Sequence, residues 1–296
     1  MRLITRADLD GLTSAILLQE VEAIEEVDFA HPKDVQDGKV AITANDVLAN
    51  LPFDERAGLW FDHHLSQSDA SWNPNMKGAY EIAPSAARVI SDHYKSPKFE
   101  RFHDLLEATD RLDAALLTRE DVNNPQGWIL VGYTLDPRSG LGAFKDYFRH
   151  LMQLARDNKT VDQILADEKV KVHVDRLKRE EEAFKKHLQE SSKLEGNVVI
   201  TDVRGQKDLP TGNRYLIYEL FPTANVSVRL ADGKGGEFVS IQVGHSIFNR
   251  NCNTSIGDLL ADHGGGGHFG AGTCQPVAAD AQRVIDEVVK TLKANG

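Results

Sequence analysis

Short apolar runs that end in polar residues recur through the first 64 residues, and this pattern constrains the fold most strongly. The runs are RLIT at 2–5, VDFAHP at 27–32, VAITAND at 40–46 and AGLWFDHH at 57–64. After the first run, GLTSAILLQEVEAI has apolar residues at helical spacing, which predicts a helix beginning near Gly11. Strands that alternate with helices predict an α/β fold with a mostly parallel sheet. In such sheets, ligands bind at the carboxyl ends of the strands.

The remainder of the chain predicts a helical region, a long charged helix and a second α/β unit. Residues 84 to about 157 have a helical pattern, and 161–193 combines many close acid–base pairs with few helix breakers. GNVVITDVRG opens a further unit, ANVSVRLADGKGGEFVSIQVGHS predicts a hairpin, and 278–295 predicts a closing helix. We therefore predict an N-terminal domain over 1–158, a connecting helix over 159–194 and a smaller C-terminal α/β domain over 195–296.

The composition argues against several classes of function. Hydrophobic residues make up 41% of the 296 residues, which is enough for a full core, and the formal net charge is -11. So large an acidic surplus argues against sequence-independent binding of long duplex DNA, although a small anion can still be held by a local basic pocket or by metal. The start of the chain has no signal-peptide pattern, no run of about 18 apolar residues is present, and the two cysteines indicate no disulfide framework. We expect a soluble cytoplasmic protein without membrane association.

Carboxylates and histidines gather at the ends of three predicted strands. They are Asp8 and Asp10 after the first run, Asp46 at the end of the third, and Asp62, His63 and His64 at the end of the fourth. Because the ends of parallel strands lie on one edge of a sheet, these groups would repel one another without a cation. Mixed Asp and His ligation suits a divalent transition ion such as manganese, with zinc, cobalt or iron as alternatives. An Asp at a strand end can instead cap a helix, as Asp10 or Asp46 would, but capping alone leaves the joint pattern unexplained.

These motifs resemble those of the DHH phosphoesterase superfamily. Asp62-His63-His64 matches the motif that gives the superfamily its name, and RADLDG at 6–11 matches its His-x-Asp-x-Asp-Gly motif except at the first position. Asp46 matches the acidic strand end of the second motif, and Asp110 matches the fourth motif, with Asp113 as the less favoured alternative. Near the C-terminus, GGGGHFGAGT resembles the glycine-rich segment of the associated second domain. The superfamily includes exopolyphosphatases, manganese inorganic pyrophosphatases, and nucleases and phosphodiesterases for short oligonucleotides and cyclic dinucleotides.

The resemblance implies a two-metal hydrolase. It assigns one metal to Asp10, Asp46, His63 and Asp110, and the other to Asp8, Asp46 and the leading histidine of the motif. It puts His64 beside the bridging water or the leaving group, with Asp62 orienting its neighbours. Two ions that share a carboxylate polarise a phosphoryl oxygen and generate hydroxide from water. We expect Mn²⁺, with Mg²⁺ or Co²⁺ as alternatives, bound as one or two ions.

Arg6 stands where the motif has its leading histidine. Arginine remains protonated and offers no lone pair to a metal. Three interpretations stay open: water replaces the missing ligand at a weak site, one metal acts while Arg6 supplies charge to the substrate phosphate, or the chain binds its ligand without catalysis. A guanidinium grips phosphate in a bidentate way, which suits the second interpretation. An ion pair with Asp8 would be a purely structural role for the same side chain.

The segment HGGGGHFGAG at 263–272 predicts a binding site in the C-terminal domain. Consecutive glycines let the backbone approach a ligand, and their N–H groups can form an anion-binding nest. A flexible turn is the structural alternative. The candidate substrate-binding residues are Gly265, Gly266, Gly267, His268 and Arg250, with Arg229 as an alternative to Arg250.

These features predict a metal-dependent phosphoesterase, exopolyphosphatase-like, that hydrolyses a terminal phosphate or phosphodiester of a short anionic substrate in the interdomain cleft. A phosphodiesterase for short oligonucleotides or cyclic dinucleotides is the first alternative, with Phe248 and Phe269 as candidate stacking residues. A non-catalytic sensor of a phosphorylated ligand, suggested by Arg6, is the second. A structural assembly protein would leave the DHH and GGGGH motifs unexplained. The sequence leaves the oligomeric state open, with a homodimer among the options.

Overall fold

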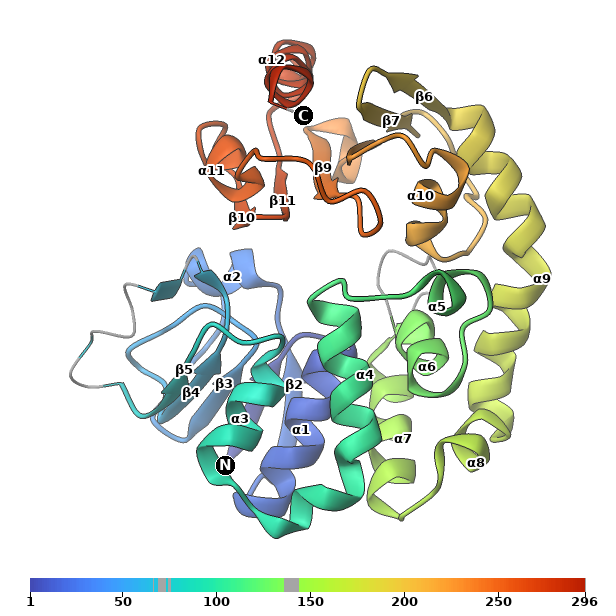
Figure 1. Cartoon of the computed structure of the whole chain (residues 1–296). Coiled ribbons are helices and arrows are strands. Elements are labelled where there is room, and N and C mark those ends of the chain that lie inside the picture. The colour runs from blue at the N-terminus through green and yellow to red at the C-terminus, as the bar shows by residue number, and fades with distance from the viewer. Residues whose placement is uncertain (66, 69–72, 74–75, 136–143, 296) are drawn as a thin grey trace. The chain divides into compact units, whose positions relative to one another are not determined.

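The computed structural model describes residues 1–65, 67–68, 73, 76–135 and 144–295, and the chain divides into two compact units. The first unit is Met1–Arg179 and the second is Glu180–Gly296. The division falls inside helix α9 (Glu168–Ser191), which forms the greater part of the predicted connecting helix (Figure 1). The roles predicted for the domains stay predictions. Within the described ranges, no helix is long and apolar enough to cross a membrane.

Five strands of the described residues form a parallel sheet in the first unit, as the alternating pattern predicts. They are β1 (Arg2–Thr5), β2 (Glu26–Phe29), β3 (Asp46–Ala49), β4 (Leu59–Asp62) and β5 (Gly78–Tyr80). Their order is β2-β1-β3-β4-β5, and every pairing is parallel. The strand order reverses between β1 and β3, and a sheet of this kind binds ligands at the carboxyl ends of those two strands.

Strand β3 begins later than the sequence pattern predicts. We expected a strand ending at Asp46, but Asp46 is the first residue of β3 and pairs with Arg2 at the start of β1. Its carboxylate accepts hydrogen bonds from Arg2 Nε at 2.8 Å, from Thr43 N at 2.7 Å and from Thr43 Oγ1 at 3.0 Å. These bonds close a turn before the strand. Asn50, rather than Asp46, therefore stands at the carboxyl end of β3.

Helix α1 (Leu9–Val21) is buried from Leu9 to Leu18 because other helices pack around it. Figure 1 shows these neighbours, which are α3 (Ala86–Tyr94), α4 (His103–Asp113) and α7 (Phe144–Arg156). The shorter helices of the unit are α2 (Pro32–Gln36), the 3-10 helix η2 (Pro97–Phe102), α5 (Arg119–Asn123), α6 (Gly127–Leu135) and α8 (Val161–Leu165). The helical region predicted from residue 84 to about 157 is thus confirmed for the described residues, and 136–143 lie outside them. Trp60 of β4 anchors a further apolar cluster and donates a hydrogen bond to Leu51 O at 2.8 Å.

The second unit is a mixed sheet with helices packed against it. Its described strands have the order β10-β11-β9-β8-β7-β6, in which β7 and β8 are parallel and the other pairs antiparallel. They are β6 (Ser192–Glu195), β7 (Val198–Asp202), β8 (Val226–Asp232), β9 (Val239–His245), β10 (Gly266–His268) and β11 (Ala271–Cys274). The helices are the short α10 (Ile217–Leu220), then α11 (Ile256–Ala261) and α12 (Ala281–Ala294), whose apolar residues share one core with the strands.

The predicted hairpin and closing helix of the second unit are confirmed as β8–β9 and α12. Gly235 and Gly236 have positive φ angles of 68° and 73° in the hairpin turn, which is the conformation that glycine adopts without strain. Strand β6 was not predicted. Its residues follow the last turn of α9, and their mixed polar and apolar pattern resembles a continuation of that charged helix.

Candidate metal centre and active site

Polar side chains from three strand ends come together at the carboxyl edge of the first sheet. Arg6 and Asp8 follow β1, Asn50 follows β3, and His63 and His64 follow Asp62 at the end of β4. Asp10 joins them from the first turn of α1, and Asp113 from the last turn of α4. The parallel sheet therefore gathers most of the residues that the sequence predicted, with two exceptions described below.

Asp10, His63 and Asp113 form a compact cluster that can hold a divalent metal. Their ligand atoms all lie within 4.8 Å of one another. His63 Nε2 is 3.1 Å from Asp113 Oδ2 and 3.8 Å from Asp10 Oδ2. Asp10 is 2% exposed and His63 is 7% exposed, so both groups need a charged partner at this depth. Two carboxylates and one imidazole are a donor set that suits a transition-metal cation.

A backbone carbonyl orients His63 for ligation. His63 Nδ1 lies 3.0 Å from Ala83 O, which only accepts hydrogen bonds, so Nδ1 carries the hydrogen. In the neutral ring, Nε2 then presents its lone pair toward Asp10 and Asp113. This is the arrangement in which a second hydrogen bond fixes the tautomer of a metal-binding histidine.

The carboxylates of Asp10 and Asp113 concentrate negative charge around His63 and so favour a cation at this position. Burial raises the pKa of Asp10, and the neighbouring Asp113 and Asp8 carboxylates raise it further. Burial opposes charge on His63, but the hydrogen bond and charge of Asp113, with the charge of Asp10, outweigh it and raise the pKa of His63 to about 10. The His63 imidazolium in turn holds the pKa of Asp113 below its usual range, although desolvation acts in the opposite direction. Protons thus fill the role of a cation when no metal is bound.

Asp10 is fixed by the start of another helix. Its two oxygens accept hydrogen bonds from Ala86 N at 3.0 Å and Ala87 N at 2.8 Å, in the first turn of α3. The glycine that follows Asp10 has a packing reason, because a Cβ added to Gly11 would lie 1.9 Å from Arg6 O. The Asp-Gly pair therefore lets α1 start directly against the loop that carries Arg6.

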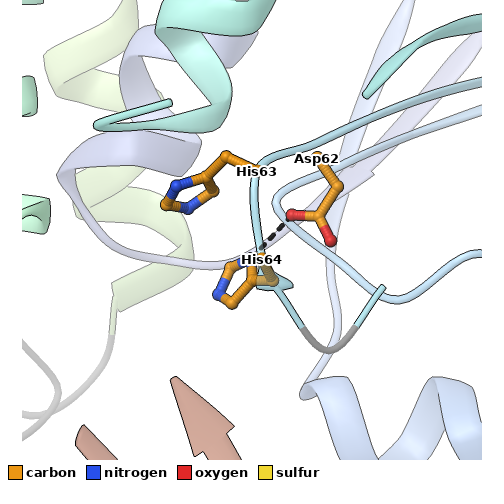
Figure 2. A group of neighbouring side chains, drawn as sticks. All are labelled: Asp62, His63 and His64. Atoms are coloured by element: carbon orange, nitrogen blue, oxygen red, sulfur yellow. Dashed lines mark hydrogen bonds and ion pairs between the residues drawn. The ribbon is translucent and has the colours of Figure 1, made fainter. Parts of the chain in front are cut away.

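Asp62 and His64 form a second pair beside the cluster. Asp62 is 1% exposed, and its Oδ1 accepts a hydrogen bond from His64 Nδ1 at 2.6 Å. Figure 2 shows His64 turned back toward Asp62, while the ring of His63 points to the other side. A buried carboxylate that accepts a hydrogen bond from Nδ1 fixes the tautomer and the orientation of the ring. His64 is therefore equipped to move a proton through Nε2.

Asp113, rather than the favoured Asp110, lies against His63, with 3.1 Å between Asp113 Oδ2 and His63 Nε2. Asp110 accepts hydrogen bonds from Ser85 Oγ at 2.6 Å and from Arg88 Nε at 2.8 Å. Ser85 is the N-cap of α3, so Asp110 supports the helix start that also holds Asp10. The two aspartates are three residues apart on one helix face, and sequence spacing alone does not distinguish them.

Asp46 does not reach the cluster, which corrects its predicted role as the bridging ligand. It lies at the opposite edge of the sheet, where Arg2 and Thr43 occupy its carboxylate. Asn50 takes the place at the carboxyl end of β3. It is 1% exposed with φ at 57°, and in the described part of the chain its Oδ1 has no hydrogen-bond partner. The sequence offered one signal for Asn50 as a site residue. Asparagine tolerates positive φ, and Asn50 directly follows the apolar run DVLA, where a strand can end.

Arg6 forms the ion pair that the sequence allowed. Its Nε lies 3.2 Å from Asp8 Oδ2, and its side chain is 33% exposed. Asp8 Oδ1 accepts hydrogen bonds from Asn50 Nδ2 at 3.1 Å and from Gly11 N at 3.0 Å. Within the described residues, the terminal nitrogens of Arg6 have no hydrogen-bond partner, so the guanidinium is held at one side and open at the other.

The glycine-rich segment of the second unit forms strand β10 and the turns around it. Gly265 and Gly267 are required by packing, because a Cβ would lie 2.3 Å from Thr273 O at the first and 2.2 Å from Ala271 O at the second. A Cβ on Gly266 would meet no atom within 4 Å. His268 ends β10, and Arg250 lies in the loop before α11 with its Nε donating to Ile247 O at 3.0 Å. Their roles as substrate-binding residues stay predictions.

The comparisons with known proteins find likenesses among solved structures. No protein-family model matches the chain, and no curated protein does. A pGpG-specific phosphodiesterase, PggH from Vibrio cholerae, is 38% identical with a TM-score of 0.77, and the match covers 100% of this chain and 99% of PggH. The DHH domain of a protein described as a member of a family of ribosomal proteins is 15% identical with a TM-score of 0.61, covering 99% and 86%.

RecJ from Thermus thermophilus, solved in complex with Mg²⁺, is 15% identical with a TM-score of 0.53, and this chain spans 50% of its length. At 15% identity, the likenesses to RecJ and to the ribosomal-family DHH domain show the fold alone. The identity to PggH over the full length shows the family. The chain belongs to the DHH phosphoesterase superfamily, as its motifs predicted, and is a hydrolase of phosphoester bonds.

Proposed function

We propose that this chain is a divalent-metal-dependent phosphodiesterase that cleaves a linear dinucleotide with a 5′-phosphate, such as pGpG. The observation that carries the proposal is the Asp10–His63–Asp113 cluster, in which Asp10 and His63 are buried, beside the Asp62–His64 pair. The substrate class is supported by the 38% identity to PggH over the full chain. The exopolyphosphatase-like activity favoured by the sequence stays a prediction, as do the cytoplasmic location and the homodimer.

The metal centre would consist of Asp10, His63 and Asp113. They fit a cation by donor type, by the burial of Asp10 and His63, and by the fixed tautomer of His63. We favour Mn²⁺, since an imidazole among carboxylates suits it better than Mg²⁺. When bound, the cation supplies positive charge to a phosphoryl oxygen and lowers the pKa of water. Asp10 and Asp113 would remain carboxylates, and Ala83 would keep His63 in place.

The chain's own groups would complete the hydrolysis. A water oxygen forms a bond to the phosphorus, and the bond from phosphorus to the 3′ oxygen breaks. His64 would give a proton to the departing 3′ oxygen, while Asp62 holds the ring in place through Nδ1. Arg6 would grip the phosphate through its open terminal nitrogens. The products of pGpG would be two molecules of guanosine 5′-monophosphate.

Exposed apolar side chains favour a nucleotide over polyphosphate. Leu65, Ile82 and Leu116 are 49%, 75% and 53% exposed, and each lies within three residues of His64, Ala83 or Asp113 in the sequence. In the second unit, Phe269 is 52% exposed with its ring edge-on to His245. Bases gain free energy by stacking on such apolar and aromatic surfaces, whereas polyphosphate offers only charge.

The decisive experiment measures product release from a panel of substrates with Mn²⁺ and with chelator. The panel comprises pGpG, short RNA oligomers, phosphoadenosine phosphate, cyclic dinucleotides and polyphosphate. We expect Mn²⁺-dependent turnover of pGpG that Asp113→Asn abolishes and that Arg56→Ala, an exposed arginine paired with Asp54, does not change. Turnover of polyphosphate alone would establish the exopolyphosphatase activity instead. If no substrate of the panel is hydrolysed while metal is bound, the result would contradict the proposed enzymatic activity and support the non-catalytic sensor.

A further inference from the structure

The two sides of the carboxyl edge differ in charge. On one side, Asp10 and Asp113 supply two carboxylates to a neutral or protonated His63. On the other side, the single carboxylate of Asp8 is already paired with the guanidinium of Arg6 at 3.2 Å. A divalent cation placed beside Asp8 would therefore face an arginine that cannot lose its proton.

Both oxygens of Asp8 already have partners, and one of these partners is a permanent cation. Its Oδ1 accepts from Gly11 N and Asn50 Nδ2, and its Oδ2 faces Arg6 Nε. The neighbour that could share a ligand, Asn50, offers a neutral amide in place of a carboxylate. The Asp8 side is thus electrically balanced by Arg6 without any metal.

We infer that this chain holds one divalent cation and that the Arg6 guanidinium supplies the fixed positive charge on the other side of the substrate phosphate. Asp8 holds Arg6 in place, and Asn50 in turn holds Asp8. The inference deepens the proposed function and rests on it. Asp8 contacts Nε, and the Arg6 side chain is 33% exposed, so its two terminal nitrogens can make the bidentate contact that guanidinium forms with phosphate. Asn50 is a positioning residue, because it holds Asp8 rather than the substrate.

The first test counts the metal, which does not depend on activity. Wild-type protein loaded with Mn²⁺ and desalted is expected to carry one manganese per chain, with the six-line electron paramagnetic resonance spectrum of an isolated ion. Arg6→His and Asn50→Asp alone should each leave one ion, because each restores a single ligand. The double variant should bind two ions and give a broadened, exchange-coupled spectrum. Two coupled ions in the wild type would overturn the inference, as would a folded double variant with one.

The second test stays informative if the double variant does not fold. Arg6→Ala should lower kcat/KM by about 100-fold, the size of effect seen when one donor to a developing charge is removed. Free guanidinium at millimolar concentration should restore at least part of that loss, whereas an equal concentration of sodium should not. Arg56 pairs with Asp54 on the surface, so the Arg56→Ala variant should keep its activity and should not respond to added guanidinium.

The outcomes separate this inference from the proposed function. Turnover of pGpG with one Mn²⁺ and no rescue by guanidinium would refute the charge role of Arg6 and leave the phosphodiesterase intact. Turnover of pGpG with two ions bound to the wild type would refute the single-metal count and likewise leave the phosphodiesterase intact. Bound Mn²⁺ without turnover of any substrate would remove the proposed function, and a chain that binds no Mn²⁺ would remove both.

Discussion

At the scale of single residues, His63 shows how the centre is prepared before any metal arrives. Ala83 O fixes one ring nitrogen, and Asp113 with Asp10 surrounds the other. The same carboxylates that would bind the cation hold a proton on His63 in its absence, since they raise its pKa to about 10 against the effect of burial. Metal and proton therefore compete for one place.

The first prediction concerns that competition. Below a pH of about 10, His63 is protonated in the metal-free protein, and binding of Mn²⁺ must release this proton. The raised pKa of Asp10 adds to the release as pH falls. As the pH rises from 6 to 8, the apparent Kd for Mn²⁺ should decrease about tenfold per pH unit for each proton displaced. Calorimetry in buffers with different ionisation enthalpies would measure the protons released, and binding without release would contradict the assignment.

The second prediction separates the two aspartates of α4. Asp113→Asn should weaken Mn²⁺ binding by more than about 100-fold with little loss of stability, because it removes a proposed ligand at the helix end. Asp110→Asn should keep Mn²⁺ binding but cost about 1–3 kcal/mol of unfolding free energy, since it breaks the contacts to Arg88 and Ser85. Metal titration and urea unfolding of both variants would test this, and the reverse outcome would restore Asp110 as the ligand.

At the scale of elements, the sequence predicted the parallel sheet and the motifs at its edge but not the register of each group. The run at 40–46 has the composition of a strand, yet the carboxylate of Asp46 bonds to Arg2, which is distant in sequence, and so the strand begins where we expected its end. Asn50 was missed for this reason. Asp110 and Asp113 share a helix face, and only the packing of α4 against α1 decides which one meets His63.

The third prediction concerns the glycine run of the second unit. Gly266→Ala should fold normally, because the added Cβ meets open space, but should raise KM if this backbone receives the substrate. Gly265→Ala is the matched variant. It should destabilise the unit by about 1–3 kcal/mol, because its Cβ would lie 2.3 Å from Thr273 O. Thermal unfolding and steady-state kinetics measure the two effects, and an unchanged KM in Gly266→Ala would argue that the segment is only a turn.

At the scale of the whole molecule, the chain consists of two units that each bury their own core. The metal centre lies wholly within Met1–Arg179, and the glycine-rich segment lies wholly within Glu180–Gly296. Among the described residues, the core of the second unit contains none from the proposed metal centre. The proposed metal chemistry and the predicted substrate binding would therefore belong to parts of the chain that have separate cores.

The fourth prediction follows from this division. Mn²⁺ at 100 times its Kd should stabilise the first unit by about 2.7 kcal/mol, because it binds the folded state and not the unfolded chain. The second unit should gain nothing. Differential scanning calorimetry with Mn²⁺ and with chelator should therefore resolve one transition that moves and one that does not. A shift of both transitions by the same amount would show that the units unfold as one.

The segment at 83–87, Ala-Pro-Ser-Ala-Ala, has no titratable side chain, yet three acidic or histidine side chains depend on it. Ala83 O holds His63, the N–H groups of Ala86 and Ala87 hold Asp10, and Ser85 Oγ binds Asp110. Both ends of this short turn thus set the separation between a histidine and a carboxylate of the metal centre. A substitution in this segment would therefore change the geometry of the proposed metal centre without altering any of its proposed ligands.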